Sequence, residues 1–206
     1  MSAAPSTKDK ILTQSRELFN SEGFGALTAV DIANYLSMSP GHLYYHFKGK
    51  AEIAAALLTA HIEELETIKN AALSACVGTK ATIEAAWTWM HILVEEAWDA
   101  RFAYREPLAI VRSDARLANQ MRHMFSVQHD AAWGLLHALR SSGTILASDE
   151  AFDGLVHQVA LGLAFQLVRM EFDAQVTEKP RDLIARAAAL IILPITGFIA
   201  PSVQAT

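Results

Sequence analysis

Apolar residues recur at intervals of three and four along nearly the whole of this 206-residue chain. That spacing places them on one side of a helix, because an α-helix has 3.6 residues per turn. Alternating apolar and polar residues, which indicate strands, form no run of useful length. The pattern therefore predicts an all-α fold. With 52% hydrophobic and 19% charged residues the chain is too apolar to be disordered, and the excess suggests an oligomer interface or an apolar ligand cavity.

Capping residues, glycines and prolines divide the chain into about nine helices. Ser6 and Thr28 each precede an Asp by three residues, the spacing of a capping box, and Ser39 precedes a proline at a third helix start. The first helix is expected to stop at Gly23. The later helices are expected at about residues 50–75, 80–98, 101–113, 115–141, 150–173 and 180–199. Pro107 and Pro194 are expected to bend two of these.

Residues 28–47 have the pattern of a helix-turn-helix, in which two short helices are joined by a tight turn. The second helix of this motif enters the major groove of DNA with its N-terminal residues forward. Its inward positions must be apolar, and Leu43 and Phe47 meet that need. Because the net charge is −5, contact with DNA must come from one small region rather than from the whole surface.

The outward positions of the second helix carry small or polar residues that can approach bases and phosphates. Gly41 would let the backbone come close to DNA, and His42 is the best candidate for a base edge. The predicted DNA-binding residues are Thr28, Ser39, Pro40, Gly41, His42, Tyr44, Tyr45, His46 and Lys50. Lys50 is expected to hold a phosphate from the start of the next helix.

The stretch from Leu27 to Ala33, and the sequence Leu-Tyr-Tyr-His-Phe-Lys-Gly-Lys at residues 43–50, resemble the N-terminal domain of the TetR family of regulators. The resemblance covers about residues 8–58. It implies a homodimer with an all-helical body, usually a repressor that a small molecule releases from a palindromic operator. Two residues depart from the family pattern. Val30 replaces a polar residue that often helps to read DNA, and Ser37 replaces the usual turn glycine, which predicts mild backbone strain.

The expected organisation is a three-helix DNA-binding domain at 1–50 and a helical ligand-binding and dimerisation domain at 51–206. In the second domain, aromatic residues at helical spacing suggest an apolar cavity, although such residues are also typical of an ordinary core. The predicted ligand-binding residues are Trp87, Met90, His91, Val94, Trp98, Tyr104, Phe125, His129 and Trp133. Arg105 is a further candidate for orienting a ligand.

The last two long helices are expected to pair with their symmetry mates in a four-helix bundle. Small residues such as Gly162 would let the helices approach closely. The predicted interface residues are Leu155, Val159, Leu163, Leu167, Ala187, Ile191 and Ile195. The alternative is that both helices belong to the core of a monomer.

Several classes of protein are disfavoured. The single cysteine, Cys76, excludes an intramolecular disulfide, and the histidines lack the spacing of metal ligands, so neither a metal nor another cofactor is expected. Residues 1–6 lack an apolar signal stretch, and Arg186 and Pro194 interrupt the apolar run at 183–200, so a cytoplasmic protein without a membrane span is expected.

No arrangement of acids, bases or nucleophiles has the spacing of a catalytic motif, so the chain is not expected to be an enzyme. Three alternatives to a ligand-released repressor stay open: a ligand-independent regulator or activator of the same fold, an all-helical enzyme, and a helical interaction module.

Overall fold

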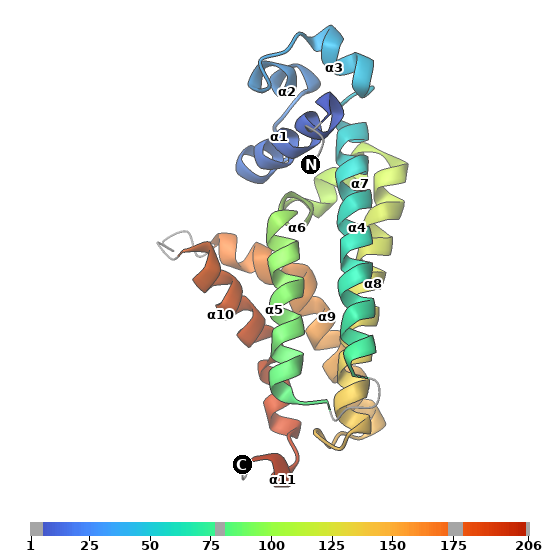
Figure 1. The fold of residues 1–206 in the computed structure, drawn as a ribbon, viewed down its shortest axis with the longest axis vertical. Helices are drawn as coiled ribbons and strands as arrows, with labels where there is room; N and C mark the ends of the chain where they lie inside the picture. The colour runs from blue at the N-terminus through green and yellow to red at the C-terminus, as the bar shows by residue number, and fades with distance from the viewer. Residues whose placement is uncertain (1–5, 77–80, 173–178, 205–206) are drawn as a thin grey trace, which may run out of the picture. The chain divides into compact units, whose positions relative to one another are not determined.

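The computed structural model describes residues 6–76, 81–172 and 179–204, and these are helical apart from turns, loops and one antiparallel bridge between Ile145 and Ile199 (Figure 1). The helices are α1 (Thr7–Glu22), α2 (Ala29–Tyr35), α3 (Pro40–His46), α4 (Lys50–Ala75), α5 (Ile83–Asp99), α6 (Phe102–Arg105), α7 (Pro107–Ser113), α8 (Ala115–Ser141), α9 (Asp149–Phe172), α10 (Pro180–Ile192), a 3-10 helix (Leu193–Phe198) and α11 (Pro201–Gln204). The predicted all-α fold is confirmed.

The predicted caps fix the ends of the first three helices. The Ser6 hydroxyl accepts the N–H of Asp9, and the Asp9 carboxylate accepts the N–H of Ser6. The same pair of bonds at the start of α2 joins Thr28 and Asp31. Each box satisfies N–H groups that a helix start would otherwise leave without partners. Gly23 ends α1 at φ 86°, a conformation that glycine adopts without a steric penalty.

The two prolines interrupt the predicted helices rather than only bend them. The expected helix at 101–113 is divided into α6 and α7 at Glu106, because the residue before a proline is disfavoured in the helical region. Similarly, α10 ends at Ile192, and the chain continues around Pro194 as a 3-10 helix rather than as an α-helix to residue 199.

The chain forms two compact units, and their boundaries differ from the predicted division at residue 50. The first unit combines residues 1–62 with 100–123, and the second combines 63–99 with 124–206. Residues 100–123 join the first unit because α6 packs on α1: the rings of Phe19 and Phe102 lie 5.6 Å apart, and the Asn20 side chain accepts the N–H of Phe102. The functional division at residue 50 stays a prediction.

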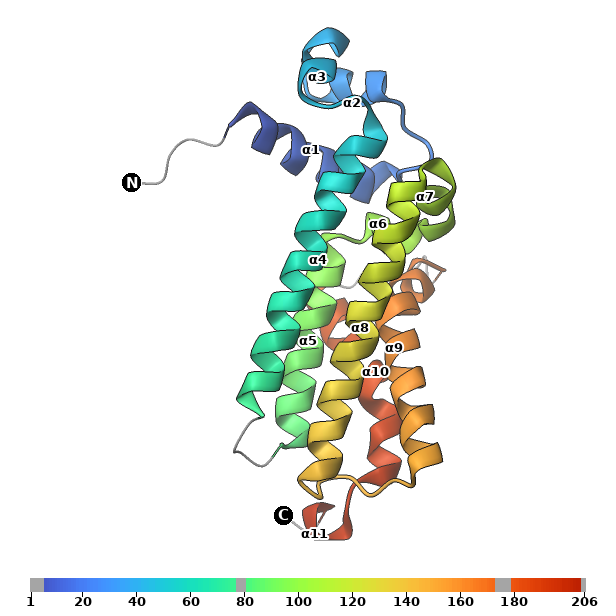
Figure 2. The ribbon, with the colours of Figure 1, turned by 90° about the vertical axis from the view of Figure 1, so that its right-hand side faces the viewer.

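In the second unit, α10 packs against α5 and α9, and α9 lies beside α8 (Figure 2). A methyl group at Gly162 of α9 would come within 2.9 Å of the Ile191 side chain, so the glycine allows α9 and α10 of the same chain to approach closely. Residues 149–170 of α9 are long and apolar enough to cross a membrane by length and composition, a property that core helices share.

Candidate DNA-binding surface

The turn between α2 and α3 is tight. The N–H of Ser37 donates to the Asn34 carbonyl, and the N–H of Met38 donates to the Ala33 carbonyl, both at 3.0 Å. Ser37 has φ 52°, the left-handed conformation that favours glycine. The expected strain is therefore located at this residue.

Replacing Ser37 with glycine should raise the free energy of unfolding by about 1 kcal/mol, because glycine adopts the left-handed region without the clash of a β-carbon. The greater freedom of glycine in the unfolded chain reduces this gain. Urea unfolding of Ser37→Gly measures the difference. Ser37→Ala is the control. Alanine keeps the β-carbon that is unfavourable in the left-handed region, so this change should not stabilise the protein.

The two sides of α3 differ as the sequence predicts. Leu43 is fully buried and Phe47 nearly so, which pins the helix to the rest of the first unit. On the outer side Tyr45 is 83% exposed and Tyr44 is 49% exposed. His42 is also exposed. The outer side of α3 therefore leaves aromatic rings accessible to a partner.

The outward rings of α3 touch one another. The rings of His42 and His46 lie 5.4 Å apart, and His46 meets the edge of Tyr45 at 5.1 Å. Ser39 caps the helix by accepting the N–H of His42, and Pro40 occupies the first helical position. The helix therefore presents a group of phenol and imidazole side chains around its first two turns.

At the start of α2 lie Thr28, a predicted DNA-binding residue, and Val30, which departs from the family pattern. The Thr28 hydroxyl is used by its capping box, since it donates to Asp31 and accepts from the Asp31 N–H. Hydrogen bonds from the Thr28 side chain and backbone lower the pKa of Asp31, so this carboxylate stays charged at the start of α2. Val30 is exposed on α2 and offers an apolar contact only.

Lys50, which was predicted to hold a DNA phosphate, contacts the protein backbone in the structure. Its ammonium donates to the carbonyls of Phe24 and Leu27, at 2.9 and 2.5 Å, and lies 4.5 Å from the centre of the Phe24 ring. Burial lowers the pKa of Lys50, against the opposing effect of the Glu106 and Asp31 carboxylates. This side chain thus ties down the turn between α1 and α2, and a phosphate contact would require it to leave these carbonyls.

Glu106 is a residue of the first unit that sequence reasoning missed. Its carboxylate accepts the N–H of Gly25 at 2.7 Å and lies against Gly23, so it fastens the α6–α7 junction to the turn after α1. The neighbouring Arg105 was a candidate for ligand contact. Its guanidinium donates a hydrogen bond to the Asn20 carbonyl in the structure. No local pattern signals these contacts, because the partners lie more than 80 positions apart.

Around the described residues, the structure places the predicted ligand-binding residues in several different surroundings. Tyr104 belongs to the first unit, where it is buried and its hydroxyl lies 2.8 Å from the His61 imidazole. Met90 and Val94 are buried in the core, Trp98 is half-buried, and Trp87 stacks on His91 along α5. The remaining three line two separate cavities of the second unit, Trp133 one of about 570 Å³ and Phe125 with His129 one of about 210 Å³.

The predicted dimer-interface residues need a correction. All seven (Leu155, Val159, Leu163, Leu167, Ala187, Ile191 and Ile195) are buried within the chain itself. Their apolar faces are the ones with which α9 and α10 pack inside the second unit. Among the described side chains, the large apolar ones that these helices leave exposed are Leu161, Phe165 and Leu190, followed by Leu193 at the end of α10.

Both the N-terminal and the C-terminal part of the chain match protein-family profiles. Residues 11–57 match the profile of bacterial regulatory proteins of the tetR family, and residues 64–206 match a TetR profile described as a bacterial transcriptional repressor.

Two individual relatives of the chain are named as HTH-type transcriptional regulators. The chain is 30% identical over 106 residues to the probable HTH-type transcriptional regulator YttP of Bacillus subtilis, a match that covers 49% of this chain and 50% of YttP. It is 44% identical over 57 residues to the HTH-type transcriptional regulator QacR of Staphylococcus aureus, covering 28% of this chain and 29% of QacR. These matches span half or less of the relatives' own lengths.

Solved structures share the fold over nearly the full chain. A TetR-family transcriptional regulator from Marinobacter aquaeolei VT8 superposes with a TM-score of 0.81 at 24% identity, covering 98% of this chain and 95% of that one. SmeT in complex with triclosan has a TM-score of 0.64 at 17% identity, covering 97% and 94%. The profile over residues 64–206 alone covers more than half of the sequence, and the chain therefore belongs to the TetR family of DNA-binding transcriptional regulators.

Proposed function

We propose that this regulator is a homodimeric repressor that binds a palindromic operator in the cytoplasm and leaves it when a small molecule binds the second unit. The observation that carries the proposal is α3, a short helix pinned by Leu43 with a group of polar rings facing outward. Membership of a family of DNA-binding regulators excludes the enzyme alternative. A ligand-independent regulator or activator is the alternative that the experiment below distinguishes.

The DNA contacts in this proposal come from α3 and the residues around it. His42 reads a base edge, while Tyr44, Tyr45 and His46 contact phosphates or further bases. The remaining proposed contacts are Thr28, Ser39, Pro40 and Gly41. The Lys50 ammonium instead binds the carbonyls of Phe24 and Leu27. Few ammonium groups are therefore left for phosphates, and the affinity for DNA should depend only weakly on salt concentration.

Gly41→Ala separates stability from DNA binding. A β-carbon at Gly41 would meet no atom of the chain within 4 Å, so alanine should fold normally and gain slightly in helix propensity. On DNA the added methyl group would hold the backbone away from the groove, which we expect to weaken binding about tenfold. Fluorescence anisotropy measures the affinity for an operator that the wild-type protein has selected from fragments of the source genome. Thermal unfolding checks that the variant is folded. An unchanged affinity would mean that the N-terminal turn of α3 does not approach DNA closely.

The proposed dimer surface is the exposed side of α9 and α10, with Leu161, Phe165, Leu190 and Leu193 at its apolar centre. A dimer is needed because a palindromic operator presents two half-sites related by a twofold axis. The family resemblance supports pairing through these two helices. Substitution of Phe165 and Leu190 by glutamate should give monomers in analytical ultracentrifugation, since it puts charges into an apolar contact.

The ligand part of the proposal is supported by the cavities of the second unit and by the fold that the chain shares with SmeT, which has been observed with triclosan. A ligand can release DNA only to the extent that it binds the DNA-free state more tightly than the DNA-bound state.

A reporter gene behind a selected operator tests the regulatory direction. A repressor silences the reporter, and a compound that binds the second unit restores expression. Activation of the reporter would contradict repression, and repression that no bound compound relieves would contradict ligand release.

A further inference from the structure

A cavity of about 570 Å³ lies between α4 and α8 in the second unit, within the size range of small-molecule sites. Trp133 and His137 of α8 line one wall, and Lys69 and Leu73 of α4 line the other. We infer that this cavity binds a planar aromatic carboxylate, whose ring lies on the Trp133 indole and whose carboxylate pairs with Lys69. The inference deepens the proposed ligand control and rests on it for the effect on DNA.

Trp133 is the aromatic surface of the site. Its side chain is on a packed helix, yet the residue is 46% exposed. His137 stacks on the indole with ring centres 4.6 Å apart and planes only 8° apart, and Phe152 meets it edge-on at 6.4 Å. Two rings therefore hold the indole in place before a ligand arrives, which reduces the entropy lost on binding.

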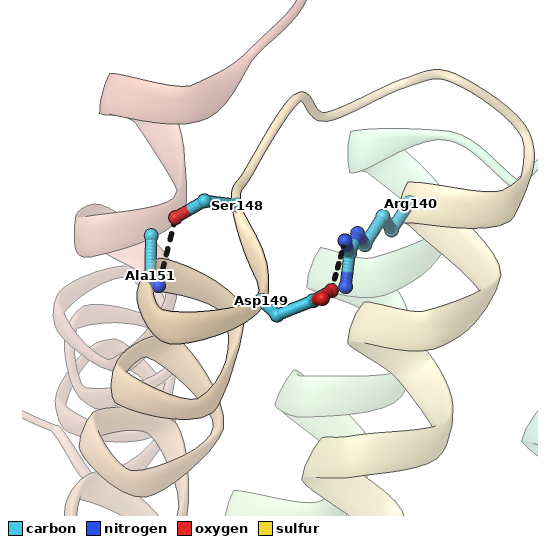
Figure 3. Close-up of polar contacts among 4 residues, drawn as sticks. All are labelled: Arg140, Ser148, Asp149 and Ala151. Carbon is cyan, nitrogen blue, oxygen red and sulfur yellow. Dashed lines mark hydrogen bonds and ion pairs between the residues drawn. The ribbon is translucent and has the colours of Figure 1, made fainter.

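Phe152 is itself held by a charged pair. The Arg140 guanidinium lies 5.1 Å from the centre of the Phe152 ring. It also binds the Asp149 carboxylate at 2.6 Å, next to the Ser148 cap that starts α9 (Figure 3). These contacts connect the end of α8 to the start of α9.

Among its described residues, the lining carries one ammonium, that of Lys69, and one carboxylate, that of Asp130, and the ammonium is the group that can pair with an anion. Lys69 is half-buried at the cavity, and within the described residues no carboxylate pairs with its ammonium. Asp130, the acidic residue of the lining, has the His129 imidazole 3.6 Å from its carboxylate. Asn70 and Ser141 add neutral polar groups to the lining, so Lys69 is its one ammonium in the part of the chain that the structure describes, and a single ammonium matches a single negative charge better than a phosphate.

The floor of the cavity is apolar. A methyl group at Gly134 would overlap the Leu73 side chain, so α4 and α8 approach closely there and Leu73 closes the space between them. An aromatic ring on this floor would displace water from apolar surface on both sides. The site thus separates into a stacking wall, an apolar floor and one cationic rim group, which are the three features that an aromatic carboxylate requires.

Calorimetry with 1-naphthoate and its neutral analogue 1-naphthamide tests this inference on the full chain without DNA. The wild type should bind naphthoate about tenfold or more tightly than naphthamide, the difference that a hydrogen-bonded charge pair provides. Lys69→Gln should remove that preference, and Trp133→Ala should weaken both compounds about tenfold. Lys179→Gln, which changes an exposed lysine outside the cavity, should bind like the wild type.

Cys76 gives a second readout that does not depend on a variant folding. It is the single cysteine of the chain, it is partly exposed, and it lines the same cavity. Bound naphthoate should slow its alkylation by iodoacetamide in the wild type. Equal affinity for the two compounds, no binding of either, or binding that leaves Cys76 alkylation unchanged would overturn the inference.

The experiment also separates this site from the proposed function. If naphthoate binds and protects Cys76 but leaves operator affinity unchanged, the site stands and release through it is wrong. If another compound releases the operator while naphthoate does not bind, the proposed function stands and this site assignment is wrong.

Discussion

Leu43→Ala is expected to lower the free energy of unfolding by about 3 kcal/mol and to abolish operator binding. Leu43 is fully buried, and it is the residue of α3 that anchors the helix from its inner side, next to Phe47 at the C-cap. Truncation removes its apolar contacts and leaves a cavity in a small unit that has few other contacts with α3. DNA binding is then lost although every outward ring is unchanged, because those rings are no longer held in one arrangement.

Urea unfolding followed by circular dichroism measures the loss of stability, and anisotropy measures DNA binding. Tyr45→Ala is the matched control, since Tyr45 is two residues away on the exposed side of the same helix and should leave stability nearly unchanged. Leu43→Met, which conserves volume, should retain most of the stability and the binding. If Leu43→Ala bound its operator like the wild type, α3 would not be the element whose position matters.

Lys50→Met is expected to lower the free energy of unfolding by about 2 kcal/mol, because it removes charged hydrogen bonds to the carbonyls of Phe24 and Leu27. Methionine keeps the length and the apolar stem of lysine, so packing changes little. It also leaves Glu106 without the nearby positive charge. Part of the loss is offset, since burial of the ammonium is itself unfavourable.

The same substitution at Lys48 is the control. Lys48 is exposed, and its contact in the structure is made by the backbone N–H, which donates to Glu52 and is unaffected by a change of side chain. Lys48→Met should therefore leave stability unchanged. A phosphate-binding Lys50 would show the opposite behaviour: its loss would reduce the salt dependence of DNA binding by about one ion and leave the unfolding curve where it was.

Local patterns predicted the first three helices well because their determinants lie close together in sequence. A capping box needs residues three apart, and the inward position of Leu43 follows from helical spacing. The strain at Ser37 was predicted from the family resemblance, because Ser37 stands where the family usually has a glycine.

Contacts over long sequence distances were not predictable in this way. Lys50 has the charge of a phosphate ligand, and only the folded chain brings the carbonyls near Phe24 to its ammonium. Glu106 likewise finds Gly25 through the packing of α6 on α1.

The C-terminal helices show a second reason why the sequence did not predict some contacts. An apolar helix face indicates burial, but it does not indicate what covers the face. Leu163 and Ile191 were assigned to a partner, whereas they pack within the same chain. On α9 the apolar residues lie on more than one side, so Phe165 on the exposed side was not distinguished from the core positions. Trp133 and His137 are four apart and could have been recognised as a stacked pair, but their cavity partner Lys69 lies on another helix.

The outward rings of α3 are expected to read the DNA sequence. Fragments of the source genome selected by the wild-type protein provide the operator, and the affinity of His42→Ala and Tyr44→Ala for that operator is the direct measurement. The account predicts a palindromic site bound by the wild type, and a loss of about tenfold or more for each variant with an unchanged melting temperature. Absence of any preferred sequence, or variants that bind as tightly as the wild type, would contradict it.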